Sequence, residues 1–200
     1  SSNLESLLWS TYLGGDGHDA AFSLKVTATG DVYVAGITQS KDLKAHTSAY
    51  QTSLKGTEDG FIARYTGQKL TNLSYLGTDK EDGAYLLDLD QTGNLYVYGT
   101  TYGTYPVSSG VYSNAGSGQF IHGLDAGLSK TVLSTVIGSG RGVPDISPTA
   151  FLVNECGNIY IAGWGGDVNV VSSHNVASST RGLPVTTDAI QRQTSGNNFY

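Results

Sequence analysis

The chain has 200 residues, a formal net charge of −6 and only 14% charged residues, against about 25% in a typical soluble domain. Its 11 Lys and Arg residues are scattered, so we expect no nucleic-acid partner, and no apolar run approaches the ~18 residues of a membrane-spanning helix, so we expect no membrane insertion. The single cysteine excludes an internal disulfide. The 27 Gly and 13 Tyr residues favour turns and strands over helices.

The sequence repeats itself three times. A segment ending in Tyr-x-x-Gly recurs 63 and then 64 residues further on, and the segments around it recur in the same order. Such self-similarity is typical of repeat folds. The copies of this segment are GDVYVAG (30–36), GNLYVYG (93–99) and GNIYIAG (157–163). The copies of the segment before it are STYLGG (10–15), LSYLGT (73–78) and STVIGS (134–139).

Each repeat predicts four short strands in the same order. The first strand is the STYLGG segment or its copy, and the third is VYVAGIT (32–38) or its copy. The second strands are AFSLKVTA (21–28), AYLLDLDQ (84–91) and TAFLVNE (149–155). The fourth strands are DGFIARY (59–65), GQFIHGL (118–124) and a truncated NNFY (197–200).

The clearest local signal is the turn between the second and third strands. Gly30, Gly93 and Gly157 each precede Asp or Asn at this point. Glycine adopts a positive φ without steric cost, and tight hairpin turns require that conformation. We therefore predict a hairpin with a positive φ at each of the three glycines.

The third strand is apolar on both faces. In its first copy Val32 and Val34 point to one side, and Tyr33 and Ala35 to the other. A strand with one face in water would instead alternate apolar and polar residues. The pattern predicts sheets stacked face to face, and a repeated four-stranded antiparallel sheet of this kind is a β-propeller blade.

The predicted fold class is all-β, with three four-stranded antiparallel blades in units 1–67, 68–129 and 130–200. A β-sandwich is the alternative, but it does not predict the repeat. Because propellers typically have four to eight blades, we expect the chain to be part of a larger propeller. Further blades or another chain would then complete it.

The repeat resembles the SBBP family of bacterial β-propeller repeats. The matching residues of the first repeat are Ser10 to Gly15, Asp19, Gly30 to Thr38, Ala49 to Gln51 and Asp59 to Tyr65. Those of the second are Tyr75 to Gly77, Asp82, Gly93 to Thr100 and Phe120-Ile121. The third departs, because GSGRGVPDISPT replaces the Asp-containing turn and the connection after Trp164 is longer.

The resemblance implies a location as well as a fold. The third repeat is similar to blades of very large surface proteins of gliding Bacteroidota, which leave the cell through the type IX secretion system. It implies a secreted or cell-surface protein and supplies no catalytic motif.

Paired carboxylates precede the second strand. Asp16 and Asp19 recur as Asp79 and Asp82. They are candidates for a Ca²⁺ site, since carboxylate oxygens are its preferred ligands. The favoured interpretation is a turn that the carboxylates close by accepting backbone N–H groups, because the feature is repeated.

Other polar motifs predict no site. Asp88 and Asp90 resemble the start of a Ca²⁺ loop but lack its later ligands, and are expected on the wet face of their strand. His122 has no metal-ligand spacing, and Cys156 takes the turn position of Thr29 and Thr92.

The long connections 38–58, 100–117 and 164–195 are the most plausible interaction surfaces, because loops on a rigid scaffold often carry function. Tyr102 and Tyr105 are not repeated and offer aromatic surface for a sugar or a protein.

Two further residues are weaker candidates for the same surface. Arg141 lies in the Gly-rich loop 138–145, and Trp164 begins the unusual Trp-Gly-Gly exit of the third repeat.

The expected function is that of a non-catalytic structural or adhesive β-propeller module, presenting inter-strand loops to a polysaccharide, a surface or a protein partner. No catalytic, cofactor-binding or metal-binding residue is predicted, and no cofactor. One alternative is an enzyme acting on polysaccharides with a site at the propeller axis. Another is an assembly subunit completed by a partner strand.

Overall fold

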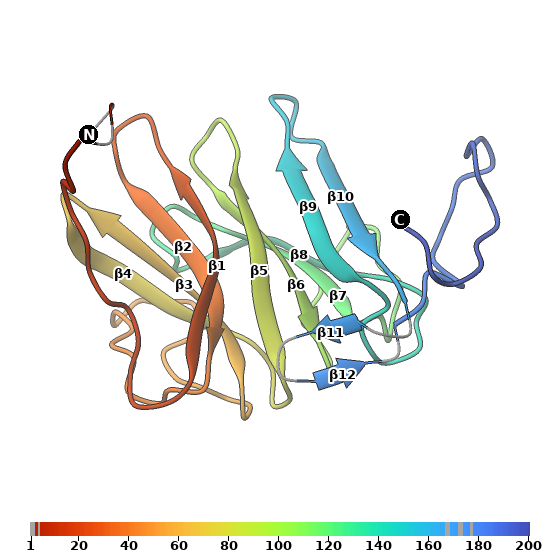
Figure 1. Cartoon of the computed structure of the whole chain (residues 1–200), viewed down its shortest axis with the longest axis horizontal. Helices are drawn as coiled ribbons and strands as arrows, with labels where there is room; N and C mark the ends of the chain where they lie inside the picture. The colour runs from red at the N-terminus through yellow and green to blue at the C-terminus, as the bar shows by residue number, and fades with distance from the viewer. Residues whose placement is uncertain (1–2, 4, 167–168, 172–173, 177) are drawn as a thin grey trace.

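The computed structural model describes residues 3, 5–166, 169–171, 174–176 and 178–200 (Figure 1). Among these residues there is no helix, and the regular structure is entirely β-strand. The strands are β1 (Asp19–Val26), β2 (Val32–Thr38), β3 (Asp59–Thr66), β4 (Lys69–Leu76), β5 (Asp82–Leu89), β6 (Leu95–Thr101), β7 (Gln119–Leu124), β8 (Thr131–Ile137), β9 (Ser147–Val153), β10 (Ile159–Trp164), β11 (Asn169–Val171) and β12 (His174–Val176). The all-β prediction is therefore confirmed.

The strands form three consecutive antiparallel sheets that follow one another across the molecule (Figure 1). Sheet 1 has the order β1-β2-β3-β4, sheet 2 has the order β5-β6-β7-β8, and sheet 3 pairs β9 with β10. Strands β11 and β12 form a separate antiparallel pair, which the sequence did not predict. Within each sheet every strand pairs with its neighbour in sequence, as short connections favour.

Sheet 3 is smaller than its repeat predicts. Beside β10 lies only the end of the expected NNFY strand, where Tyr200 N–H donates to the Gly163 carbonyl at 2.8 Å and Trp164 bridges to Phe199. Among the described residues, sheet 3 therefore has two strands, and the expected last strand contributes one bridge.

The sequence repeat and the sheet are out of phase by one strand. The LSYLGT segment lies in β4 and pairs with β3, and STVIGS lies largely in β8 and pairs with β7. Each of these segments, expected to begin a unit, thus forms the outer edge of the preceding sheet. Residues 10–15, the first copy, form no strand.

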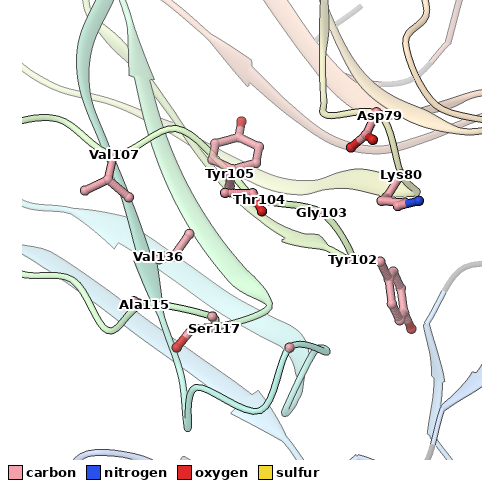
Figure 2. A pocket seen from close by; sticks show the side chains of 12 residues that line it. Asp79, Lys80, Tyr102, Gly103, Thr104, Tyr105, Val107, Ala115, Ser117 and Val136 are labelled. Atoms are coloured by element: carbon pink, nitrogen blue, oxygen red, sulfur yellow. The ribbon is translucent and has the colours of Figure 1, made fainter.

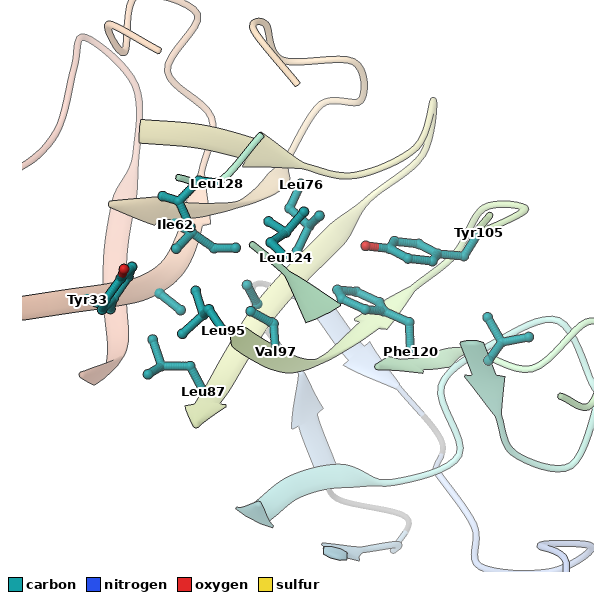
Figure 3. Packing of buried hydrophobic residues seen from close by; sticks show 13 residues of the cluster. Tyr33, Ile62, Leu76, Leu87, Leu95, Val97, Tyr105, Phe120, Leu124 and Leu128 are labelled. Carbon is teal, nitrogen blue, oxygen red and sulfur yellow. The ribbon is translucent and has the colours of Figure 1, made fainter. Parts of the chain in front are cut away.

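The sheets pack through their faces, and equivalent positions face the same way. The front face of a sheet carries Leu24 and Val26 in sheet 1 and their repeat equivalents in the others. The back face carries Tyr33 and its equivalents. The front of sheet 2 packs on the back of sheet 1 in one apolar cluster (Figure 3), and the front of sheet 3 packs on the back of sheet 2 in another.

Sheet 2 is the layer that both neighbours cover. All residues of β6 are buried, as expected for a strand apolar on both sides. The flanking copies β2 and β10 contain half-buried residues, and Tyr160 in β10 is exposed. Double burial of the third strand therefore depends on a sheet at each face.

Asp88 in β5 links all three sheets, although the sequence predicts it on a wet face. It is only 6% exposed. One carboxylate oxygen lies 3.1 Å from Lys25 Nζ of sheet 1, and the other accepts the Val153 N–H of sheet 3 at 2.9 Å. The prediction fails because the alternation of side chains along a strand shows which residues share a face. It does not show whether another sheet covers that face.

We predict that Asp88→Ala lowers the free energy of unfolding by about 1–3 kcal/mol, because it leaves the buried Val153 N–H without its acceptor. Chemical denaturation would measure the change. Asp88→Asn is the matched control, because it removes the ion pair but keeps an acceptor for Val153, and it should cost less. Equal losses in the two variants would contradict the bridging role.

Candidate functional site

The paired carboxylates close turns at the start of each sheet. Asp19 accepts the Gly15 N–H at 2.9 Å, and Asp82 accepts the Thr78 N–H at 2.6 Å. In the third repeat Asp145 does the same for the Ser139 N–H at 2.7 Å. These contacts support the turn interpretation.

Asp145 was missed in the sequence because its turn is longer. From the glycine that begins the turn to the carboxylate there are six residues in the first two copies and eight in the third, at 138–145. The repeat itself contains the signal: Asp145 follows Asp82 at the same distance along the sequence as Asp82 follows Asp19.

The remaining carboxylates of these turns do not form a metal site. The Asp16 N–H donates to Asp42 at 3.0 Å, and Asp79 lies exposed at the molecular surface. Within the described ranges, no group of three or more His, Cys, Asp and Glu side chains is arranged to hold a metal ion.

Two buried carboxylates meet between sheets 1 and 2. Burial raises the pKa of Asp82 to about 6, with a smaller contribution from the charge of Asp59. Burial also raises the pKa of Asp59, against the lowering effect of hydrogen bonds from Lys55, Gly56 and Gln51. Both carboxylates therefore accept backbone N–H groups inside the fold, where their charged forms are costly.

His122 lies at the centre of a buried polar cluster. Its two ring nitrogens are 3.0 Å from Tyr105 Oη and 2.9 Å from Thr131 Oγ1, and Tyr50 packs edge-on against the ring. Burial lowers the pKa of His122 to about 4. The imidazole is therefore neutral at pH 7. Its hydrogen bond with Tyr105 joins the connection after β6 to sheet 2, and the one with Thr131 lies within sheet 2.

Tyr105 belongs to this core. It is 5% exposed and stacks on Phe120 with ring centroids 4.0 Å apart and an interplanar angle of 8°. The expectation of exposed aromatic surface at this residue is corrected, because the ring packs on Phe120 of β7 inside the apolar cluster between sheets 1 and 2. Its pKa is raised by burial.

A hollow of about 460 Å³ opens where the turn before β5, the connection between β6 and β7 and the turn before β9 meet. Figure 2 shows the turn with Asp79 and Lys80 on one side and the segment with Ala115 and Ser117 on the other. Tyr102 lies beside Lys80 at its rim, and Tyr105 lies in its wall. The lining combines an acid, a base, backbone and aromatic edges.

The connection that forms this hollow is held to its sheet. The Tyr102 N–H donates to the Glu81 carbonyl at 3.0 Å, which ties the start of the connection to the turn before β5. Further along, the Asn114 N–H donates to the Val136 carbonyl at 3.1 Å. Tyr102 itself is half-buried, and burial raises its pKa. The wall of the hollow is therefore preorganised.

Arg141 makes its contacts within its own loop. Its Nε lies 2.8 Å from the buried Asp145 carboxylate, and an Nη donates to the Pro144 carbonyl at 3.1 Å. The guanidinium thus compensates the charge that closes the turn, which accounts for an arginine here without a ligand.

Trp164 ends β10, and the glycines after it allow close packing. A Cβ on Gly166 would lie 2.6 Å from the Trp164 ring, and one on Gly165 would lie 2.7 Å from the Thr180 backbone nitrogen. The Trp-Gly-Gly sequence therefore lets the ring and the segment around Thr180 approach the chain.

Cys156 occupies a turn built alike in all three repeats. Thr27, Asp90 and Asn154 each accept, through a side-chain oxygen, the backbone N–H four residues later, at 2.8–3.0 Å. The expected positive φ is confirmed at 87° for Gly30, 85° for Gly93 and 76° for Gly157. The exposed Cys156 lies at this turn beside the acceptor Asn154, which receives its N–H at 3.0 Å.

A comparison with models of protein families finds no match, and a comparison with curated proteins also finds none. In the described part of the chain, no helix has the length and apolar character needed to cross a membrane. A functional conclusion therefore rests on the geometry of the described residues and on the sequence repeat.

The raised pKa of Asp82 and the lowered pKa of His122 give opposite pH dependences. The Asp82 contribution to stability is lost as pH rises from about 4 to about 6, whereas the His122 contribution is lost as pH falls from about 6.5 to about 4. We predict that, as pH rises, the Asp82→Asn variant becomes more stable relative to the wild type. The His122→Gln variant becomes less stable relative to the wild type over the same change.

One pKa unit corresponds to about 1.4 kcal/mol, so each difference should change by about 3 kcal/mol across its window. Denaturation of the three proteins at a series of pH values measures both slopes. Parallel curves for a variant and the wild type would show that its group is not shifted.

The turn itself predicts that Asn154→Ala lowers the free energy of unfolding by about 1 kcal/mol, through loss of its hydrogen bonds. Cys156→Thr restores the residue of the other two copies and should change stability by less than about 0.5 kcal/mol. Thermal unfolding compares the two. A large loss in Cys156→Thr would indicate a role for the thiol.

Proposed function

We propose that the chain is part of a β-propeller and acts as a non-catalytic binding module that contacts a polysaccharide through the hollow at Tyr102. The propeller reading is supported by three antiparallel sheets in sequence order, with β5 packed against both β1 and β9. These are the first strands of the three sheets, so they adjoin as the inner strands of blades around an axis would.

The observation that carries the binding role is the hollow of about 460 Å³. Its volume is in the range of small-ligand sites, which are concave and largely preformed. A tyrosine at the rim offers a flat apolar face to a sugar ring, and Asp79 and Lys80 offer hydrogen bonds to its hydroxyl groups.

The contacts of the acids in the turns and between the sheets favour binding over catalysis. Asp19, Asp82 and Asp145 each close a turn in their repeat, and Asp88 joins neighbouring sheets. A general acid or base must reach a substrate proton. These carboxylates instead serve the backbone, which supports a structural role for them.

The proposed location is secreted or on the cell surface. It rests on the likeness of the repeat to SBBP repeats, with the segments GDVYVAG, GNLYVYG and GNIYIAG as its strongest part.

We predict that Tyr102→Ala weakens glycan binding about tenfold, because a stacked aromatic ring contributes roughly 0.5–1.5 kcal/mol beyond its buried area. The measurement is a glycan array followed by titration of the best ligand. Tyr112→Ala is the matched control, because Tyr112 is a 63% exposed tyrosine of the same connection outside the hollow.

Two results would contradict the proposal. One is the absence of binding by the wild-type chain across the array. The other is release of products from a bound glycan in a hydrolysis screen, since catalysis would then be the function.

A further inference from the structure

Along β1, the front face of sheet 1 exposes positions that are buried in the interior sheets, whereas Trp9, Leu13 and the connection after β2 already pack on the rest of this face. Leu24 is 61% exposed, whereas its repeat equivalent Leu87 in sheet 2 is 2% exposed. Val26 is 58% exposed, whereas its equivalent Val153 in sheet 3 is 7% exposed. In sheets 2 and 3 these side chains contact the back face of the preceding sheet.

The back face of sheet 3 shows the complementary pattern. Tyr160 is 53% exposed, whereas its equivalents Tyr33 and Tyr96 are 1% and 8% exposed beneath the next sheet. Its direct cross-strand partner Leu152 is 51% exposed. The outer faces of the stack are thus the two halves of a contact that the chain already makes twice.

Charge does not oppose a third contact of the same kind. The repeat equivalents of Leu152 are Lys25 in sheet 1 and Asp88 in sheet 2. These two side chains form an ion pair with each other. Leu152 itself brings no charge into the contact at this position. Burying it therefore carries no desolvation cost for a charge.

We propose that a second copy of this chain binds head to tail, with the front face of its sheet 1 on the back face of sheet 3 of the first. A sheet of the same repeat has the side-chain spacing that fits these faces, and the chain carries both halves. The contact is heterologous, so copies close into a ring or grow into a chain according to the turn between sheets.

Sedimentation velocity over a wide range of protein concentration tests the contact. We expect the wild-type chain to form dimers or larger assemblies as concentration rises. Leu24→Glu blocks the front face and Tyr160→Glu blocks the back face, so each variant alone should remain monomeric. Val132→Glu is the matched control, because this 44% exposed residue lies in β8 of sheet 2 and so outside both faces, and it should assemble like the wild type.

Mixing the two blocked variants gives the sharper result. Leu24→Glu retains an intact back face and Tyr160→Glu an intact front face, so together they should form a dimer that grows no further. Both substituted side chains are exposed in the single chain, so circular dichroism and thermal unfolding should match the wild type. A monomeric wild type at every concentration overturns the proposal, and so does a mixture that fails to pair. Neither result bears on glycan binding at Tyr102.

Discussion

The structure depends on apolar contact between the back face of one sheet and the front face of the next. An antiparallel sheet with two apolar faces cannot be stable with either face in water, so each repeat relies on its neighbours for burial. Sheet 2 meets this condition on both sides, and its strand β6 is fully buried. The connection 100–117 and the hollow beside it lie against this middle layer.

Local features of the fold are predictable from the sequence because they depend on a few adjacent residues. The hairpin turns at Gly30, Gly93 and Gly157 need a positive φ that glycine supplies, and the structure has it. The bounds of β2 match the predicted VYVAGIT segment. The turn role of Asp19 and Asp82 also follows from their repetition, since a feature present in every copy serves the copy itself.

The features that the sequence does not reveal depend on which sheet lies opposite. Asp88 occupies a position that alternation assigns to water, yet sheets 1 and 3 enclose it. Tyr105 lies in a polar connection, but a space beside Phe120 and His122 receives its ring. Pairing of β4 with β3 and of β8 with β7 is likewise set by tertiary contacts, which is why sheets and repeats differ in phase.

The turn at 138–145 shows how this architecture tolerates change in length. Its two additional residues leave the closing bond between Asp145 and Ser139 intact, at 2.7 Å. Because that bond fixes both ends, the interior of the turn is free to lengthen, and the entropy of closing a loop rises only slowly with its length. The equivalent turns before β1 and β5 are therefore suitable positions for grafting foreign peptides, and the same freedom lets surface chemistry diverge between repeats while the scaffold stays constant.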